Sequence, residues 1–488
     1  MRTASETWRG KITSHETFTH DSLDSLGYDW GRIADPGVGP VRPLKVYLPE
    51  STEEVVEVLA ECRQIGQRPV IRSKGHSSND LVLSNRGAVL LTQMMDRLLD
   101  LDEAGLTATV QAGAISAVID DELAPRGLGL PVIGDHNDIT VGGFASVGGI
   151  SAGAHRYGLF VDNVERLRYV TWDGEVVECS RTERPEHFLR VLTGTGRWGV
   201  ITEMTLRLIP VDKYGTIWEN EIDHYFSLDS FIAGSARRVL DPPADAMMMR
   251  GIYVDVPLGA SRSLGAGQFS VYRETEQTPA RRARNTAAYG LLHGLGYAAG
   301  RLPAKVDLAL KQVGMASVLT SPRYASIKNV EFFTDKTLES TVGDPTRMLV
   351  VLGPLDRYEE LFRDLWNLIL DFRKRTGALT FISLYVKSIK SEYLGHGTSE
   401  ERFCEFLYYL GMHQEKMTPA VLDELVREVD DFCLERDCRR YMHTKTSADP
   451  ERRSRLDPNT YYADRFAAAS GGEPDGRALA GAGVKEQR

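Results

Sequence analysis

Cysteine is scarce in this sequence. Its five cysteines, Cys62, Cys179, Cys404, Cys433 and Cys438, are scattered and include no CxxC pair. Disulfide frameworks and structural zinc sites are usually built from an even, closely spaced set of cysteines. The pattern therefore argues against both, and it favours a reducing environment such as the cytoplasm.

Long apolar runs are also missing. No stretch approaches the roughly 20 apolar residues that a membrane-spanning helix needs, so we expect no membrane span. The first residues, MRTASETWRGKITSHETF, contain no apolar segment of the kind found in secretory signals. We therefore expect a soluble, cytoplasmic protein.

Positive charge is in deficit. The chain has 58 Lys and Arg against 68 Asp and Glu, which gives a net charge of −10. This balance argues against nucleic acid or an anionic membrane as the main partner. The remaining composition, with 42% hydrophobic and 26% charged residues over 488 positions, is that of a globular protein long enough for two cores.

Glycine, in contrast, is concentrated at two places. Residues 72–78 read RSKGHSS and follow a short apolar stretch, and residues 140–149 read TVGGFASVGG. Glycines let the backbone approach a phosphate closely, and successive backbone N–H groups form concave anion sites. The two loops together predict a bound dinucleotide, and His76 in the first loop favours a flavin.

The segment that follows extends this interpretation. Residues 135–180 read DHNDITVGGFASVGGISAGAHRYGLFVDNVERLRYVTWDGEVVECS, and residues 188–210 read FLRVLTGTGRWGVITEMTLRLIP. With the first glycine loop included, most of residues 45–210 resembles the PCMH-type FAD-binding domain of the vanillyl-alcohol oxidase family of FAD-linked oxidases. The closest pattern is that of cytokinin dehydrogenases, D-x-x-x-L-T-V-G-G-x-x-S-x-x-G.

The resemblance implies an α+β fold of two domains, a PCMH-type FAD-binding domain and a substrate domain made of a sheet with helices. Local patterns agree: Ser51 before Glu53 and Glu54 predicts the start of a helix, and the helical pattern of residues 358–377 lies between two strand-like runs. We expect a lead-in at 1–40, the FAD-binding domain at 41–211, the substrate-binding domain at 212–438, a return segment to the FAD domain at 439–466, and a disordered tail at 467–488.

The resemblance also assigns FAD-binding residues. Those expected to line the pyrophosphate and the flavin ring are Ser73, Lys74, Gly75 and Ser77 in the first loop, Thr140, Gly142, Gly143, Ser146 and Ile150 around the second, Val200 through its backbone, and Tyr441 near the C-terminus. Lys74 departs from the family pattern, and its amine either pairs with a phosphate oxygen or points to solvent.

His76 and Asp135 are the two residues expected to take part in chemistry. In the family that this chain resembles, the histidine of the G-H-S loop is joined to the C8-methyl carbon of FAD. The alternative is that His76 only donates a hydrogen bond to a phosphate or a backbone carbonyl. The second glycine loop has no cysteine, so we expect one covalent link and not two.

Asp135 stands where cytokinin dehydrogenases place the carboxylate that accepts the substrate proton. Hydride transfer becomes easier as a proton leaves the donor heteroatom, so a nearby base suits this chemistry. A turn or helix-cap role for Asp135 remains open, and Asp138 is a competing carboxylate in the same loop.

Residues 381–387, FISLYVK, alternate so that Ser383, Tyr385 and Lys387 share one face of a strand. This face either lines the substrate pocket or faces solvent. The activity implied is an FAD-dependent oxidase or dehydrogenase that removes a hydride from a C–N or C–O bond of a small organic substrate, with oxygen or another acceptor. The alternatives are a nicotinamide-dependent C=C reductase, like sterol side-chain reductases, and a non-redox flavin-binding isomerase or binding protein.

Overall fold

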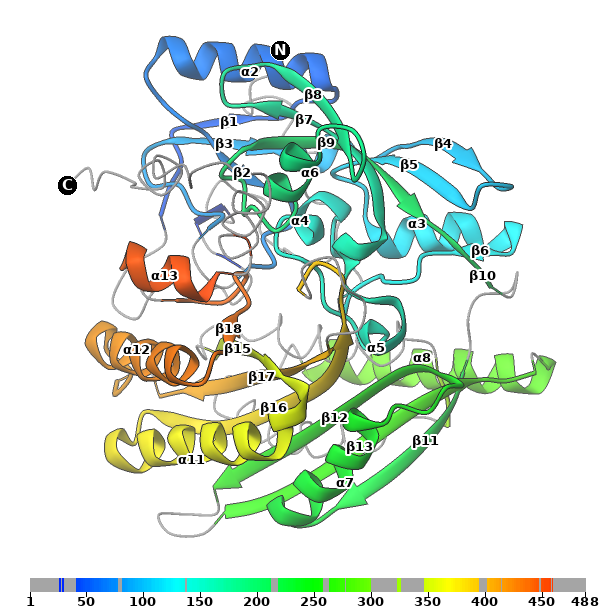
Figure 1. Ribbon diagram of the computed structural model, residues 1–488, viewed down its shortest axis with the longest axis vertical. Helices are drawn as coiled ribbons and strands as arrows, with labels where there is room; N and C mark the ends of the chain where they lie inside the picture. The colour runs from blue at the N-terminus through cyan, green and yellow to red at the C-terminus, as the bar shows by residue number, and fades with distance from the viewer. Residues whose placement is uncertain are drawn as a thin grey trace.

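A computed structural model of the chain describes residues 26–27, 29, 41–77, 81–136, 138–211, 218–257, 263–276, 278–299, 323–325, 346–394, 402–413, 415–446, 449–457 and 459. These residues form two domains, one above the other in Figure 1. The tail expected at 467–488 lies outside the described residues, as does most of the lead-in.

The first domain contains a five-stranded antiparallel sheet of order β4-β5-β9-β7-β8 and a three-stranded parallel sheet of order β1-β3-β2. The strands of the two sheets are β1 (Lys45–Tyr47), β2 (Val70–Arg72), β3 (Ala88–Leu91), β4 (Leu98–Asp102), β5 (Thr107–Gln111), β7 (Val164–Thr171), β8 (Val176–Ser180) and β9 (Gly199–Arg207). Strands β6 (Leu128–Gly129) and β10 (Ile209–Pro210) form a separate pair. The helices are α2 (Thr52–Gln64), α3 (Ser116–Leu123), α4 (Val141–Ala145), α5 (Ala154–Tyr157) and α6 (Pro185–Val191).

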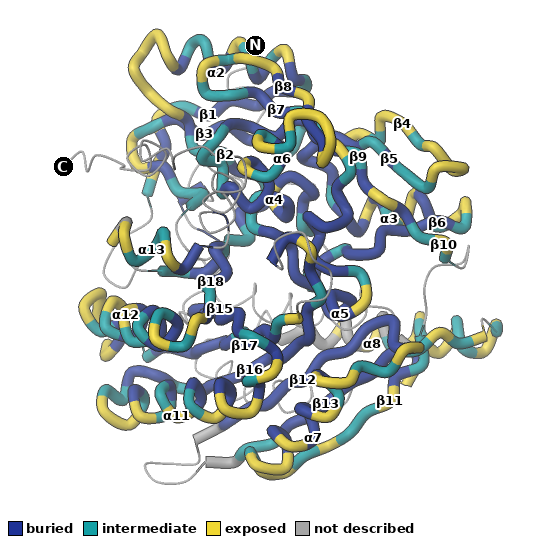
Figure 2. Tube along the Cα trace, viewed as in Figure 1, coloured by how far each residue is buried: buried dark blue, intermediate teal, exposed yellow. Residues whose placement is uncertain are grey.

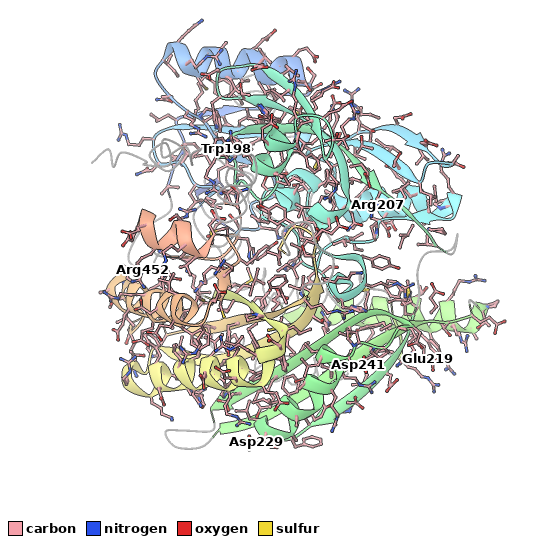
Figure 3. The ribbon with its side chains drawn as sticks, viewed as in Figure 1. Trp198, Arg207, Glu219, Asp229, Asp241 and Arg452 are labelled. Carbon is pink, nitrogen blue, oxygen red and sulfur yellow. The ribbon has the colours of Figure 1, made fainter. Side chains whose placement is uncertain are left out.

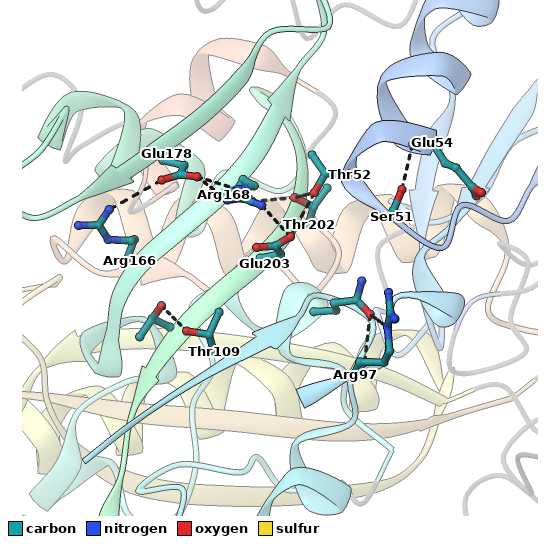
Figure 4. Close-up of polar contacts among 12 residues, drawn as sticks. Ser51, Thr52, Glu54, Arg97, Thr109, Arg166, Arg168, Glu178, Thr202 and Glu203 are labelled. Carbon is teal, nitrogen blue, oxygen red and sulfur yellow. Dashed lines mark hydrogen bonds and ion pairs between the residues drawn. The ribbon is translucent and has the colours of Figure 1, made fainter. Parts of the chain in front are cut away.

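Helix α2 begins where the sequence predicts. The side chain of Ser51 accepts a hydrogen bond from the backbone N–H of Glu54, which satisfies one of the N–H groups that a helix start leaves without a partner (Figure 4). The helix buries one side against β1 and β3, through a small core that includes Val55, Val58 and Leu59. The remaining side of α2 faces solvent (Figure 2).

A polar network joins α2 to the five-stranded sheet. Arg168 on β7 forms ion pairs with Glu178 on β8 and with Glu203 on β9, at 3.0 Å from the latter. The hydroxyl of Thr52, at the start of α2, donates to that of Thr202 on β9 at 2.9 Å (Figure 4). Thr52 and Thr202 are buried, so their hydrogen bond lies within the contact between α2 and the sheet.

The second domain is built on one antiparallel sheet of eight strands, of order β14-β11-β13-β12-β16-β17-β15-β18. The strands are β11 (Trp218–Tyr225), β12 (Ala246–Pro257), β13 (Ser263–Glu274), β14 (Tyr324–Ala325), β15 (Thr346–Pro354), β16 (Leu379–Lys390), β17 (Arg402–Met412) and β18 (Arg439–Arg440). The helices are α7 (Leu228–Leu240), α8 (Pro279–Ala299), α11 (Tyr358–Thr376), α12 (Pro419–Glu435) and α13 (Pro450–Leu456).

Helices α7, α11 and α12 cover one face of this sheet, and the largest hydrophobic core lies between them and the strands (Figure 1). Helix α11 has apolar residues at helical spacing, including Leu361, Leu365 and Phe372, and all of these are buried. It ends at Gly377, whose φ of 61° is the left-handed conformation common just beyond a helix end. The predicted strand–helix–strand order of β15, α11 and β16 is therefore confirmed.

The opposite face of the eight-stranded sheet points toward the first domain, and segments from both ends of the chain lie at this junction. Tyr441, just after β18, packs into the core of the first domain. From the lead-in, Leu26 packs against β1 and β3, and Asp29 lies 3.6 Å from the buried Arg347 of β15. These two lead-in residues are thus packed, although the polar, glycine-rich composition of 1–40 indicates a loose segment. Within the part of the chain that the structure describes, no helix is both long and apolar enough to cross a membrane.

Candidate functional site

A large cavity lies between the two domains, with about 1470 Å³ of empty space when its open mouth is included. Its walls come from the first glycine loop, from α4 and the residues after it, from the turn before β9, and from the uncovered face of the eight-stranded sheet. The titratable side chains on these walls are Lys74, His76, Asp135, His136, Tyr385, Lys387, Glu405, Tyr409, Tyr441 and His443.

The first glycine loop brings His76 to the cavity wall. Gly75 has a φ of 75°, and a Cβ there would lie 2.5 Å from the buried guanidinium of Arg72, so only glycine fits this turn. Both ring nitrogens of His76 are buried, and neither has a hydrogen-bond partner among the described residues. Burial, with smaller contributions from His136 and Lys74, holds the pKa of His76 well below its usual value. The imidazole is therefore neutral near pH 7.

The second glycine loop is partly helical, because residues 141–145 form α4. The N–H groups of Val141 and Gly142 donate to the carbonyls of Ala114 and Ala112, at 2.9 and 2.8 Å. A Cβ at Gly142 would lie 2.8 Å from the backbone oxygen of Ala112, whereas one at Gly143 would meet only the Thr140 hydroxyl, at 3.1 Å. Gly142 thus allows α4 to pack against the end of β5, and Gly143 is the glycine with space on the cavity side.

Asp135, Lys387 and Glu405 form a buried ionic cluster on the cavity wall. The Lys387 ammonium of β16 forms an ion pair with Asp135 and lies 3.1 Å from Glu405 on β17. Lys387 and Glu405 occupy directly opposite positions of the β16–β17 pair, so their side chains share one face. Burial alone would lower the pKa of Lys387, but the two carboxylates outweigh it and raise that pKa. Lys387 is therefore a fixed cation.

Glu405 shows the opposite balance. It is 1% exposed, and burial raises the pKa of its carboxyl. The ammonium of Lys387 lowers this pKa, while the negative charge of Asp135 raises it further. The cluster thus holds two carboxylates on one ammonium, with an Asp135 oxygen, Oδ1, that is buried and has no hydrogen-bond partner among the described residues.

Beside the ionic cluster the sheet wall is apolar and aromatic. Tyr385 and Tyr409 lie edge to face with their ring centroids 5.5 Å apart. They pack with Met348, Phe381 and other apolar residues of β12, β15 and β16. The face that carries Tyr385 and Lys387 is therefore a cavity wall and not a solvent-exposed surface; Ser383 on the same face is buried outside the lining.

The return segment supplies Tyr441 and His443. The Tyr441 hydroxyl accepts a hydrogen bond of 2.9 Å from the N–H of Gly149, so it supports the glycine-rich turn after α4. The rings of Tyr441 and His443 are 4.9 Å apart. Burial lowers the pKa of His443 to about 3, so this second imidazole on the cavity is also neutral.

The structure brings the predicted site residues together, although they span 369 positions of the sequence from Ser73 to Tyr441. The ones that line the cavity are Ser73, Lys74, Gly75, His76, Ser77, Asp135, Thr140, Gly142, Gly143, Ser146, Ile150 and Tyr441. Val200 does not line it: its neighbours Gly199 and Ile201 do, while Val200 is buried in the core beneath α2. In a strand the neighbours of a residue point to the opposite face, which explains this difference by one position.

The structure bears on two questions that the sequence leaves open. One is whether the Lys74 amine points to solvent, and the other is where the carboxylates of Asp135 and Asp138 lie relative to the cavity. Lys74 is buried, and burial lowers the pKa of its amine to about 8, so it does not point to solvent. Asp138 acts on that amine by raising its pKa. Asp138 is absent from the described lining of the cavity, while Asp135 belongs to the ionic cluster with Lys387.

Sequence reasoning missed several residues of the wall, namely His136, Thr195, Glu405, Tyr409 and His443. A signal for Glu405 exists in the run RFCEFLYYLGM, where a single carboxylate stands inside an otherwise apolar strand. Such a residue is rarely buried without a partner. Its partner Lys387 lies 18 positions away in the sequence, so the pairing itself depends on the strand register.

The residues present fit a dinucleotide cofactor with an aromatic ring. The buried polar atoms without a partner among the described residues include the hydroxyls of Ser73 and Ser77, both nitrogens of His76, and one oxygen of Asp135. Each such atom costs about 1–3 kcal/mol of desolvation. These atoms lie together on the walls of one cavity, which indicates that a bound molecule supplies their hydrogen-bond partners.

Comparison with known proteins agrees with this geometry. Residues 43–180 match the family described as "FAD binding domain". The chain is also similar in structure to 6-hydroxy-D-nicotine oxidase from Arthrobacter nicotinovorans, with a TM-score of 0.63 and 18% identity over 94% of both chains. The predicted two-domain PCMH-type α+β fold is therefore confirmed, as is the resemblance to FAD-linked oxidases.

Similar sequences include L-gulonolactone oxidase from Bos taurus, 33% identical over 34% of this chain and 38% of that protein. Others are cytokinin dehydrogenase 8 from Oryza sativa subsp. indica, 33% identical over 34% of each chain, and a putative D-arabinono-1,4-lactone oxidase from Neurospora crassa, 30% identical over 36% of this chain and 31% of that protein. The chain thus matches only about a third of the length of these curated relatives.

Proposed function

We propose that this protein is an FAD-dependent oxidoreductase that removes a hydride from a C–N or C–O bond of a small organic substrate, because residues 43–180 match the FAD binding domain family. The observation that carries the proposal is the cavity itself. A buried, neutral imidazole stands on its cofactor-domain wall, and a carboxylate held by a buried ammonium stands at the junction with the sheet. FAD, when bound, supplies the electron acceptor for the hydride.

His76 is the residue proposed to hold FAD covalently. A neutral imidazole nitrogen carries the lone pair that such a bond requires, and burial keeps His76 neutral. Both of its nitrogens lack a partner within the described chain, so no competing hydrogen bond must be broken. The buried hydroxyls of Ser73 and Ser77 and the amine of Lys74 would hold the phosphates.

Asp135 is proposed as the proton acceptor. Its Oδ1 atom is an acceptor without a partner among the described residues, and its other oxygen is fixed by Lys387. Lys387 therefore orients the Asp135 side chain and leaves one oxygen for the substrate N–H or O–H. This arrangement agrees with removal of a proton as the hydride leaves the neighbouring carbon.

The sheet wall bears on the substrate. Tyr385, Tyr409 and Met348 offer an apolar and aromatic surface directly beside the ionic cluster. A substrate that fits both has an apolar or aromatic body with an amine or hydroxyl at one end. This preference differs from the sugar lactones that the names of two relatives mention.

Two measurements test the proposal. After precipitation of the purified protein in trichloroacetic acid, the yellow flavin colour should stay with the pellet, and His76→Ala should release it. Anaerobic addition of substrate candidates, namely primary amines, primary alcohols, lactones and N6-isopentenyl adenine, should bleach the flavin absorption. Purified protein that contains no flavin would contradict the proposal, while flavin that only NADPH bleaches would favour the C=C reductase alternative.

A further inference from the structure

The turn between α6 and β9 holds an unusual backbone. Thr193 and Thr195 have φ angles of 55° and 49°, in the left-handed region that β-branched residues rarely adopt. The same turn contributes Thr195, Gly196 and Gly199 to the cavity wall. Backbone strain of this kind persists only where surrounding contacts impose it, and it is often found at ligand sites.

Asn459, in the return segment, supplies a large part of these contacts. Its side-chain nitrogen lies 3.0 Å from the carbonyl of Leu192 and 3.2–3.3 Å from those of Leu189 and Arg190. These carbonyls belong to the end of α6, where a helix leaves such groups without partners. The same nitrogen lies 3.3 Å from the Thr193 hydroxyl. One buried amide therefore caps α6 and contacts the first strained residue.

Neighbouring side chains hold Asn459 in place. Arg197 donates to the Asn459 side-chain oxygen at 2.7 Å and forms an ion pair of 2.7 Å with the buried Asp457. The hydroxyl of Tyr393, which follows β16, hydrogen-bonds to Thr193 and lies 3.2 Å from the Asn459 nitrogen. The turn is thus fixed jointly by the second domain and by the return segment. Figure 3 labels Trp198, the residue that follows Arg197 in this turn.

The strained turn is hydrogen-bonded directly to the end of α4, which belongs to the second glycine-rich segment. The N–H groups of Thr193 and Thr195 donate to the carbonyls of Ala145 and Ser146, both at 2.9 Å. These carbonyls stand at the end of α4. The left-handed conformation of the two threonines directs their N–H groups to α4, so that the turn and the helix end form one continuous wall.

We propose that Asn459 is a positioning residue for the cofactor. By holding Thr193 in the left-handed region, it shapes the wall formed by the turn and α4, so that FAD affinity depends on docking of the return segment. Asn459 is absent from the cavity lining and acts only through the turn. The inference rests on the proposed function, since it takes FAD as the occupant of the cavity.

The test uses the full-length protein in a His76→Ala background, where FAD binding is reversible and its Kd can be measured by flavin fluorescence titration. Asn459→Ala should weaken FAD binding by about tenfold to a hundredfold, the scale of buried polar groups left unpaired. Asn220→Ala is the matched control, because Asn220 is also a buried asparagine, on β11 far along the sheet. It should leave the Kd unchanged.

A glycine rescue distinguishes positioning from general destabilisation. Thr193→Gly removes the strain at that position, since glycine adopts a positive φ without cost. Added to Asn459→Ala, it should restore most of the FAD affinity. Tyr393→Phe deletes only one hydroxyl, so it should also weaken FAD binding, but by a smaller factor than Asn459→Ala. This variant keeps the inference testable if Asn459→Ala fails to fold.

Several outcomes overturn the inference. The inference is wrong if Asn459→Ala and Tyr393→Phe both bind FAD with the Kd of the His76→Ala parent. It is also wrong if Asn459→Ala loses affinity and Thr193→Gly does not restore it. If wild-type protein carries no flavin and the parent binds none, the proposed function fails and this inference fails with it. Flavin binding in the parent with no effect of Asn459 overturns the inference alone.

Discussion

Lys387 and Asp135 form an ion pair although 252 positions separate them in the sequence, and they come from different domains. Lys387 stands in the second half of β16, and Asp135 lies in the segment before α4. The pair therefore joins the wall formed by the eight-stranded sheet to the wall formed by the first domain. Glu405 on β17 completes this junction from the second domain.

Loss of the ammonium should destabilise the protein strongly. Lys387→Met leaves the buried Glu405 beside Asp135 without a cation, and removal of one partner of a buried pair costs about 3–5 kcal/mol. The free energy of unfolding, measured by urea titration, should fall by that amount. Addition of Glu405→Gln to Lys387→Met should recover a large part of the loss, because it removes the uncompensated charge.

The matched control for this prediction is an exposed ion pair on α11. Lys374 lies 3.1 Å from Asp371, and both side chains are largely exposed. Lys374→Met should change the free energy of unfolding by less than about 1 kcal/mol. Equal losses in Lys387→Met and Lys374→Met would show that the cluster at the domain junction has no special energetic role.

The two glycines of α4 should behave differently when replaced. In Gly142→Ala the new Cβ meets the backbone of Ala112 at 2.8 Å, so overpacking should lower the free energy of unfolding by about 1–3 kcal/mol with or without flavin. In Gly143→Val the side chain extends into the cavity, so flavin content should fall. Flavin absorption per protein and melting of the apoprotein measure the two effects. The same loss of flavin in both variants, without loss of apoprotein stability, would contradict this division.

The pH dependence of stability should reflect the buried histidines. Burial lowers the pKa of His443 in the folded chain to about 3 from 6.5. A depressed folded pKa contributes stability that is complete above pH 6.5 and is lost as the pH falls toward 3, because the unfolded chain binds a proton that the folded chain refuses. In protein without bound FAD, His76 acts in the same direction. Each histidine contributes a slope of up to about 1.4 kcal/mol per pH unit.

Urea unfolding at several pH values between 7 and 4 tests this expectation. The free energy of unfolding should fall with pH, and His443→Gln should make the decline shallower. His224, which is exposed on β11, provides the control, because His224→Gln should leave the slope unchanged. A slope in His443→Gln equal to that of the wild type would mean that this imidazole does not titrate as its burial implies.

The parts of the fold that depend on local pattern could be predicted from the sequence. The capped start of α2 at Ser51 and the amphipathic repeat of α11 are examples, because each is specified by residues within a few turns of one another. The first glycine loop is similar, since Gly75 and His76 are neighbours and the tight turn depends on Gly75 alone. Such features need no knowledge of the partner domain.

Features that depend on distant pairing could not be predicted in the same way. The ionic cluster requires the register of β16 and β17, which places Lys387 opposite Glu405. The helical state of residues 141–145 depends on the hydrogen bonds that Ala112 and Ala114 accept, and these lie about thirty positions earlier. Asn459 shows no motif of its own, because its significance comes from the carbonyls of α6 around it.

The proton acceptor gives the last prediction. Asp135→Asn keeps the size of the side chain and one oxygen toward Lys387, but it removes the basicity. If Asp135 accepts the substrate proton, flavin reduction by a substrate found in the anaerobic screen should slow by about 10²–10⁴, the usual contribution of a positioned acid–base group. Flavin content should stay unchanged, because the ion pair between Asp135 and Lys387 lies outside the two glycine loops.

Asp138→Asn is the matched control for that variant. Asp138 is absent from the described lining of the cavity, so flavin reduction in Asp138→Asn should proceed at the wild-type rate. Stopped-flow measurement of the flavin absorption under anaerobic conditions compares the three proteins. A normal rate in Asp135→Asn with a slow rate in Asp138→Asn would transfer the role to the other carboxylate. Normal rates in both would leave Glu405 as the remaining carboxylate in the described lining of the cavity, and Glu405→Gln would then decide whether any carboxylate accepts the proton.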